Sequence, residues 1–228
     1  MILSGPEWQV LIFSLAVSAL SLLLVVLPAL LLAILTARWK HPVSSLLEAI
    51  ATLPLAIPPV ATGLFLLKVF SRQHVFGRWL YESGIVIPFS TNAVIVALAI
   101  MSFPLVYRPM KAGFEAIDPE LLKLCRTQGR SPLYSFFHVQ VPLARHALIA
   151  GLLLGWARAL GEFGCTIVFA GDVAGETRTL ALAIFNYIEF GQDIPALRLA
   201  LITVFITLGL VVLAGWVMRR GTSESFKI

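Results

Sequence analysis

The sequence has few charged residues. Asp, Glu, Lys and Arg make up 13% of its 228 residues, whereas a typical soluble domain carries about 25%. Hydrophobic residues make up 59%. Because a spanning helix needs roughly 20 apolar residues, the chain has room for about five or six spans and for no separate soluble domain. We therefore expect an all-α, polytopic membrane protein with one transmembrane domain over residues 1–228.

Cysteine is also scarce. The chain has two, Cys125 in a polar segment and Cys165 in an apolar one, which indicates no disulfide framework. The histidines lie in separate loops without the spacing of metal ligands, so we expect no metal site. They are His41, His74, His138 and His146.

A nucleotide-binding motif is missing. No G-x-x-x-x-G-K-[ST] sequence occurs in the chain, so it has no P-loop to hold ATP phosphates. We expect no enzymatic activity and no cofactor bound by this chain. If ATP drives its work, the nucleotide and Mg²⁺ bind to a separate ATPase subunit.

Basic residues are absent before Arg38, whereas a secretory signal begins with a basic region and has a short apolar core. Here the first apolar run is about 28 residues long, enough to span a bilayer. We expect a retained transmembrane helix.

Five apolar segments fit the length of a span. Pro28 interrupts the first segment, and Pro54, Pro58 and Pro59 interrupt the second. Residues 180–188 are expected to form a short helix at the outer membrane edge. The five spans are expected at about residues 9–37, 46–70, 89–107, 143–171 and 195–218. Each is long enough to cross a bilayer, which takes about 20 residues.

Lys and Arg are distributed unevenly over the loops. When alternate loops are counted together, one set of loops holds eleven Lys and Arg residues and the other set holds five. Arg158 lies inside the fourth span. Because cytoplasmic loops carry the excess, we expect the N-terminus outside and the C-terminus inside, with residues 118–142 in the cytoplasm. We expect no nucleic-acid partner. The eleven are Arg38, Lys40, Arg108, Lys111, Lys123, Arg126, Arg130, Arg145, Arg219, Arg220 and Lys227; the five are Lys68, Arg72, Arg78, Arg178 and Arg198.

Residues 118–142 (DPELLKLCRTQGRSPLYSFFHVQVP) form the most polar segment. Asp118-Pro119 and Ser131-Pro132 are helix starts, and Gly129 stands where a left-handed C-cap belongs. We predict two short helices joined by a turn at 128–131. Either the segment packs back on the spans, or it is a rigid projection that docks in a groove of another protein. The residues expected on one side of the second helix are Leu133, Phe136, Phe137 and Gln140.

This segment resembles the cytoplasmic signature of bacterial ABC importer permeases, E-A-A-x-x-x-G-x9-I-x-L-P. Gly129 is followed by nine residues and then by Val139-x-Val141-Pro142. The E-A-A triplet reads Lys-Leu-Cys here, so no role of the family's Glu is carried over. In that family the signature meets the ATPase, and the resemblance implies the same contact here. The implied contact residues are Cys125, Arg126, Gly129, Arg130, Ser131, Pro132, Leu133, Phe136 and Phe137.

Residues 53–59 read LPLAIPP. Proline within a span bends the helix and frees backbone carbonyls, and such a break survives in lipid only where protein or water covers it. The break is either a packing kink or the wall of a permeation path. Oxyanion permeases of the ABC class have a similar L-P-x-x-x-P-P run, which favours a path beside Pro58, Pro59, Thr62 and Gly63.

Arg158 and Glu162 lie four residues apart within the predicted fourth span, so they can pair on one helix. A lone charge at that depth costs about 2.5–3.5 kcal/mol or more, and pairing lowers the cost. The pair either locks helix packing or belongs to an anion route or its gate, on which we also expect Gly164 and Thr166. Gly151 and Gly155 form a G-x-x-x-G pair that allows helices to approach closely.

Residues 156–164 (WARALGEFG) resemble the A-R-x-L-G-E-F-G signature of molybdate and sulfate permeases, and residues 175–179 (GETRT) resemble a run of molybdate permeases. The resemblance implies the permease subunit of a bacterial ABC importer of the inner membrane. It implies a homodimer, two ATPase subunits and a periplasmic molybdate-binding protein, which Glu176 and Arg178 would contact. Molybdate, tungstate and sulfate remain open as substrates.

Two other functions are less well supported by the residues. A secondary transporter would need repeat symmetry and unpaired membrane acids, but Glu162 has Arg158 beside it. An enzyme that acts on lipid phosphate would need His, Asp, Ser or Arg clustered near one interface, and these residues are dispersed.

Overall fold

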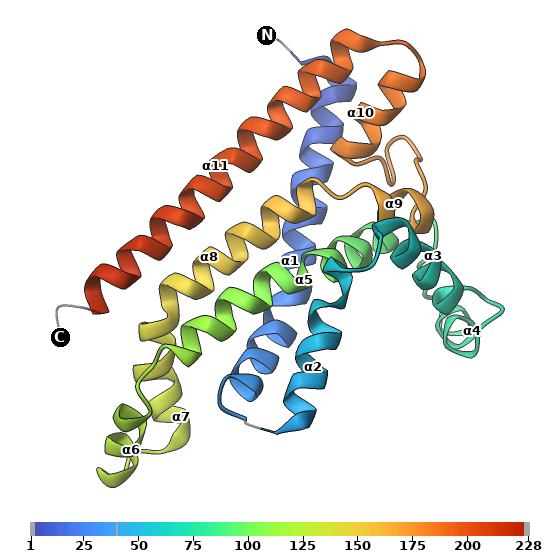
Figure 1. Cartoon of the computed structure of the whole chain (residues 1–228). Coiled ribbons are helices and arrows are strands. Elements are labelled where there is room, and N and C mark those ends of the chain that lie inside the picture. The colour runs from blue at the N-terminus through green and yellow to red at the C-terminus, as the bar shows by residue number, and fades with distance from the viewer. Residues whose placement is uncertain (1–2, 40, 226–228) are drawn as a thin grey trace.

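The computed structural model describes residues 3–39 and 41–225, with the backbone alone for residues 221–225. Lys40 and Lys227, counted above for the orientation, lie outside the described residues. All regular structure in the described part is helical (Figure 1). Four helices there are long and apolar enough to cross a membrane, or five if a sharply bent pair is one span. The predicted all-α, multi-span architecture is confirmed.

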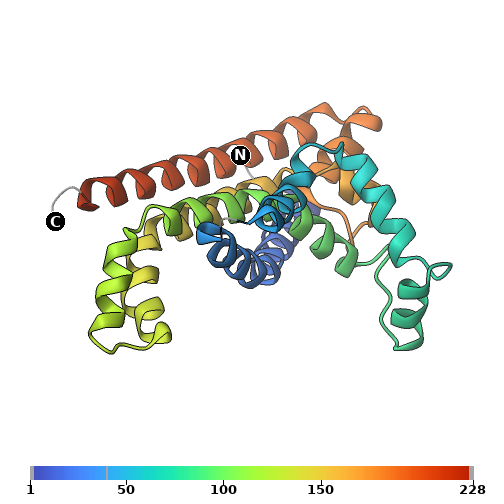
Figure 2. The same ribbon diagram turned by 60° about the horizontal axis from the view of Figure 1, so that its bottom comes forward.

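The four long helices are α1 (Gly5–Arg38), α5 (Thr91–Glu115), α8 (Val141–Leu160) and α11 (Asp193–Ser225). Helix α5 is central, because it packs against both α1 and α8, while α11 runs along α8. Figures 1 and 2 show α5, α8 and α11 side by side, with α1 crossing them. Small buried residues of α5, such as Ala93 and Ala97, allow this close packing.

A buried acid fixes the start of α1. The Glu7 carboxylate accepts a hydrogen bond from the backbone N–H of Ser4 at 2.6 Å, which is half of a capping box. The same oxygen lies 3.2 Å from Nη1 of Arg198 in α11, and the Glu7 side chain is 2% exposed. Glu7 therefore ties the two terminal helices together.

The second predicted span is broken, as the prolines indicated. Helix α2 (Pro42–Thr52) passes into a 3-10 turn (Leu53–Leu55), and α3 (Pro59–Phe70) leaves at 109° to it. Pro59 has no N–H to donate and stands at the first position of α3, where none is needed.

The third span is longer than predicted. We expected it to end near residue 107, where Arg108 and Lys111 begin a basic stretch, but α5 continues to Glu115. Lys111 Nζ pairs with Oε1 of Glu48 at 2.7 Å and with Oε1 of Glu115 at 3.2 Å. These ion pairs neutralise the charge of Lys111, so α5 extends past its apolar run.

The fourth span is shorter than predicted. We expected one helix over residues 143–171, but α8 ends at Leu160, and a separate short helix, α9 (Gly164–Phe169), follows. Gly161 stands at the C-cap of α8. The Glu162 carboxylate then accepts the N–H of Cys165 at 2.7 Å, which satisfies one donor of the new helix.

Shorter helices complete the chain. The predicted helix at 180–188 is present as α10 (Leu180–Glu189), and the predicted pair is present as α6 (Pro119–Thr127) and α7 (Pro132–Ser135). A π-helical turn (Phe136–Gln140) joins α7 to α8. Helix α4 (Val75–Glu82) lies between the second and third predicted spans, where we predicted no helix.

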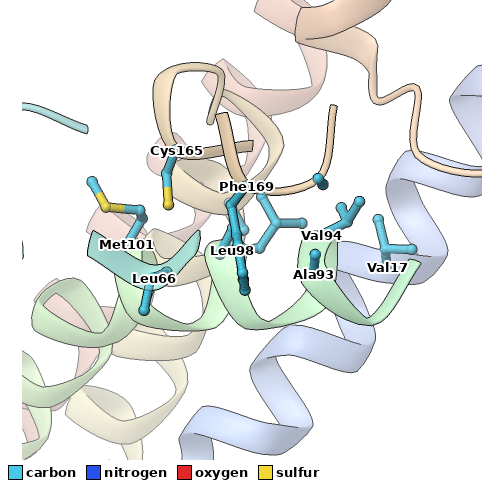
Figure 3. Packing of buried hydrophobic residues seen from close by; sticks show 11 residues of the cluster. Val17, Leu66, Ala93, Val94, Leu98, Met101, Cys165 and Phe169 are labelled. Atoms are coloured by element: carbon cyan, nitrogen blue, oxygen red, sulfur yellow. The ribbon is translucent and has the colours of Figure 1, made fainter. Parts of the chain in front are cut away.

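Phe169 of α9 is fully buried in the core near the breaks. Figure 3 shows Cys165 and Phe169 packed over Leu66 of α3 and Leu98 and Met101 of α5. This cluster joins both broken spans to the central helix, and Val17 adds α1 to it.

The predicted G-x-x-x-G pair lies where α8 meets α5. A Cβ on Gly151 would stand 2.8 Å from the carbonyl oxygen of Val106, and one on Gly155 would overlap the Val106 side chain. The glycines therefore set the distance between the two helices.

We expect Gly151→Ala to lower the free energy of unfolding by about 1–3 kcal/mol, because the new methyl group meets a backbone atom that cannot move alone. The matched control is Gly209→Ala in α11, where an added Cβ has nothing within 4 Å. Thermal unfolding midpoints in detergent compare the two. A midpoint for Gly151→Ala at or above that of the control would contradict the packing described.

Candidate functional site

Helices α6 and α7 project from one end of the bundle, beyond the ends of α5 and α8 (Figures 1 and 2). Asp118 Oδ1 accepts the N–H of Glu120 at 2.8 Å, and Ser131 Oγ accepts the N–H of Tyr134 at 3.1 Å. Both predicted N-caps are thus formed, and they fix where each helix begins.

The turn between α6 and α7 is a Schellman motif. Gly129 has φ 73°, which favours glycine. Its N–H donates to the carbonyl of Arg126 at 3.0 Å, and the N–H of Arg130 donates to the carbonyl of Cys125 at 3.0 Å. The two helices are therefore held at a fixed angle by backbone bonds rather than by a flexible loop.

The projection exposes large apolar side chains beside basic ones. Leu124 is 57% exposed, Leu133 71% and Phe137 61%, and Arg126 and Arg130 are exposed too. The Arg130 guanidinium lies 4.7 Å from the centre of the Tyr134 ring. Such a mixed apolar and basic surface suits a groove on another protein.

The prediction that Leu133, Phe136, Phe137 and Gln140 share one side of a helix is wrong. The π-helical turn adds a residue per turn and rotates the later positions. Phe136 is half-buried and stacks on Phe114 with ring centres 6.4 Å apart, whereas Phe137 points outward. Phe136 thus packs back on the bundle, as one interpretation expected, and docking of the exposed Phe137 in another protein stays a prediction.

The other predicted contact residues lie on the same projection. Gly129, Ser131 and Pro132 are exposed, and Cys125 is half-buried. Contact of these residues with an ATPase stays a prediction.

The two helix breaks meet each other. A Cβ on Gly63 of α3 would stand 2.7 Å from the carbonyl oxygen of Cys165 in α9, and one on Gly164 would stand 2.9 Å from Cβ of Pro59. The structure thus brings together predicted path residues that are about a hundred positions apart. Only glycine permits the backbones to approach this closely.

Two threonines at this junction differ in their hydrogen bonding. Thr166 is fully buried and its hydroxyl donates to the carbonyl of Phe163 at 2.8 Å. The Thr62 hydroxyl is covered by protein and has no hydrogen-bond partner among the described residues. That these residues, with Pro58, line a path stays a prediction.

The Arg158–Glu162 pair is formed, with Nη2 and Oε2 2.6 Å apart. Its position differs from the one expected, because Arg158 lies in the last turn of α8 and Glu162 lies after that helix. The Glu162 side chain is 1% exposed, and its second oxygen holds the N–H of Cys165. Both carboxylate oxygens therefore stabilise the break between α8 and α9.

Hydrogen bonds within the loop at 171–179, and one from α10, hold the loop in a fixed conformation. Arg178 Nε donates to Oδ1 of Asp172 at 2.7 Å, and Asn186 Nδ2 donates to Oδ2 at 3.1 Å. The Thr177 hydroxyl donates to the carbonyl of Gly171 at 3.0 Å. Arg178 is thus held within the loop, while Glu176 is exposed; contact of either with a binding protein stays a prediction.

Sequence reasoning missed a polar hollow between α2 and α5. It has a volume of about 390 Å³. Arg108 and Thr52 line it together with the ion-paired Glu48, Lys111 and Glu115. The i, i+4 spacing of Lys111 and Glu115 was the available signal. Among the described residues, no group of three or more His, Cys, Asp or Glu could hold a metal.

Solved structures share this fold. A chain of a bacterial alginate ABC transporter in complex with alginate pentasaccharide-bound periplasmic protein matches with a TM-score of 0.71 at 17% identity, over 95% of this chain and 80% of that one. A chain of the MetNI methionine ABC transporter, in inward-facing conformations, matches with a TM-score of 0.64 at 19% identity, over 94% and 99%. The fold is that of a membrane subunit of ABC transporters.

Sequence comparison gives the family. Residues 29–221 match the model of the binding-protein-dependent transport system inner membrane component, and the chain belongs to this family. It is 37% identical to the molybdenum transport system permease protein ModB of Escherichia coli K12, over 96% of each chain. It is 36% identical to the ModB protein of Haemophilus influenzae, over 91% of each. With the sulfate transport system permease protein CysT of E. coli K12 it shares 36% identity, over 73% of this chain and 60% of that one.

We expect Glu162→Ala to lower the free energy of unfolding by about 1–3 kcal/mol or more, because it leaves Arg158 and the N–H of Cys165 without their partner. Glu162→Gln is expected to cost less, since its amide oxygen can still accept from that N–H. Unfolding midpoints of both variants, with Glu189→Ala at an exposed position as control, give the order. Equal midpoints for the Ala and Gln variants would contradict the capping role.

Proposed function

We propose that the chain is the transmembrane subunit of an ATP-driven importer for molybdate. Two copies would form the path, two ATPase subunits would dock on the projection α6–α7, and a periplasmic binding protein would deliver the anion. The likeness to permeases named for molybdenum transport over 96% of their length carries this proposal. The GETRT run at 175–179 supports the same substrate.

The proposal places the ATPase against the exposed face of α6 and α7. Leu133 and Phe137 are large, exposed apolar anchors, and aromatic anchors in pockets often carry much of the binding energy. The caps and the Schellman turn make the projection rigid, so a movement of the ATPase is passed on rather than absorbed.

Helix α8 would carry that movement to the path. It begins at the π-helical turn after α7 and ends at the Arg158–Glu162 pair, next to the junction of the two breaks. A shift of the projection would therefore displace the break and open or close the path by a rigid-body mechanism.

The junction suits an anion that must pass without being trapped. Arg158 is the basic residue beside the two breaks, and Glu162 neutralises it at 2.6 Å. A strongly cationic site would hold the anion, whereas a weak one lets it leave. Selection among oxyanions would then rest mainly on the binding protein.

Uptake by proteoliposomes tests the function. The vesicles contain this chain with its cognate ATPase, and the cognate binding protein and ATP are supplied on opposite sides. We expect molybdate accumulation that requires ATP and both partners, with sulfate as the comparison anion. Uptake of sulfate in place of molybdate, or uptake without the ATPase, would contradict the proposal.

We expect Phe137→Ala to weaken the complex with the ATPase by more than about 1 kcal/mol, or more than fivefold in affinity. Phe205→Ala on α11 is the control, because Phe205 is similarly exposed, at 70% against 61%. Phe136→Ala is expected instead to lower the unfolding midpoint, because that ring stacks on Phe114. Titration of the purified ATPase in detergent measures affinity, and an unchanged affinity for Phe137→Ala would argue against this docking face.

A further inference from the structure

Helix α4 is attached firmly to the end of α3. Gly77 is buried, and a Cβ there would overlap the carbonyl oxygen of Ser71. Phe76 packs on Phe70 at the end of α3 in an edge-on arrangement, with ring centres 5.3 Å apart. In Figures 1 and 2, α3 and α4 form an arm directed away from α8 and α11. Helix α4 is therefore held against the end of α3.

The free face of α4 is apolar. Val75 is 85% exposed, Trp79 60% and Phe76 45%. Val75 and Trp79 are one helical turn apart and lie on the same face. Helix α3, which carries α4, also exposes Leu64 and Phe65, at 50% and 68%. In water such an array would be unfavourable.

Basic residues accompany this apolar face. Arg72 and Arg78 are exposed, and neither forms an ion pair with a described residue. The Arg72 guanidinium lies 3.5 Å from the centre of the Tyr81 ring. This stacking uses the flat side of the guanidinium and leaves its N–H edge available to an anion.

A small hollow lies under α4. It has a volume of about 260 Å³ and is lined mostly by apolar residues, among them Leu67, Ile87 and Phe89, with Ser71, Arg72 and Tyr81 as its polar members. An apolar recess with one cation matches the two parts of a phospholipid, an acyl chain and a phosphate.

The chain places α4 at a membrane boundary. It lies between the end of α3 at Phe70, which closes the bent span, and the start of the next span at Thr91. Trp and Tyr are enriched at this boundary, and Arg reaches lipid phosphates from it.

We propose that α4 lies in the membrane–water interface and binds anionic phospholipid, with Val75 and Trp79 among the lipids and Arg72 and Arg78 on phosphate groups. The positive charge beside the apolar face favours this occupant over a second copy of the chain or a soluble protein. The arm would then anchor α3, and with it the junction of the two breaks, to the lipid surface. The proposal requires only that the chain spans a membrane, and it is independent of the transported substrate.

Spin-label accessibility tests the position of α4. The label is attached to Val75→Cys in a chain with Cys125→Ser, which removes the partly exposed thiol. The remaining thiol, Cys165, is fully buried, so we expect it not to react. The full chain is reconstituted in vesicles of phosphatidylcholine and phosphatidylglycerol. Phe205→Cys on α11 is the lipid reference, and Glu120→Cys on α6 is the water reference.

We expect the label at position 75 to collide with oxygen more than the water reference does and with a nickel chelate more than the lipid reference does. Accessibility equal to that of the water reference would overturn the proposal. A label shielded from both reagents would also overturn it, because a protein would then cover α4.

A second comparison tests the anionic headgroup. Omitting phosphatidylglycerol, or adding Arg72→Gln and Arg78→Gln, is expected to raise the nickel-chelate collision rate at position 75 by about twofold or more, because the attraction to lipid phosphate is lost. Lys123→Gln, in α6 at the opposite end of the molecule (Figure 1), is the control for a loss of charge. A rate that neither change affects would overturn the assignment of anionic phospholipid.

Discussion

The two helix breaks are in close contact, and the packing of the whole bundle is built around this contact. A bilayer tolerates interrupted helices only where protein covers the freed backbone groups. Here each break covers the other, because Gly63 and Gly164 let α3 and α9 approach to the distance of backbone contact. Phe169 and Cys165 then seal the junction against α5. The sharp bend of 109° places α3 against the short α9 in this arrangement.

The same contact connects two distant parts of the molecule. Helix α8 has the projection α6–α7 at its start and the Arg158–Glu162 pair at its end. The glycines at 151 and 155 hold α8 against α5 at a short distance, so α8 cannot bend away without moving its neighbour. A rigid connection of this kind suits the proposal that an ATPase subunit supplies the energy from outside the membrane. A lipid-anchored arm at α4 would hold the far side of the junction while α8 moves.

Much of this could be predicted from sequence, because the signals were local. Pro58-Pro59 marked the bend, Asp118 and Ser131 marked helix starts, and Gly129 marked the turn between them. What could not be predicted depended on distant partners. Lys111 extends α5 because Glu48, on another helix, neutralises it. Glu162 ends one helix and caps the next, although its spacing from Arg158 suggested a continuous one. The π-helical turn that separates Phe136 from Phe137 has no recognisable pattern in the residues.

We propose that the projection α6–α7 faces the cytoplasm and is covered there by an ATPase. Labelling of Ser131→Cys with a membrane-impermeant maleimide tests it most directly, with Cys125→Ser removing the nearby thiol. We predict no labelling in intact spheroplasts, labelling in inside-out vesicles stripped of the ATPase, and protection when the ATPase is added back. Labelling of spheroplasts from the outside would contradict the account.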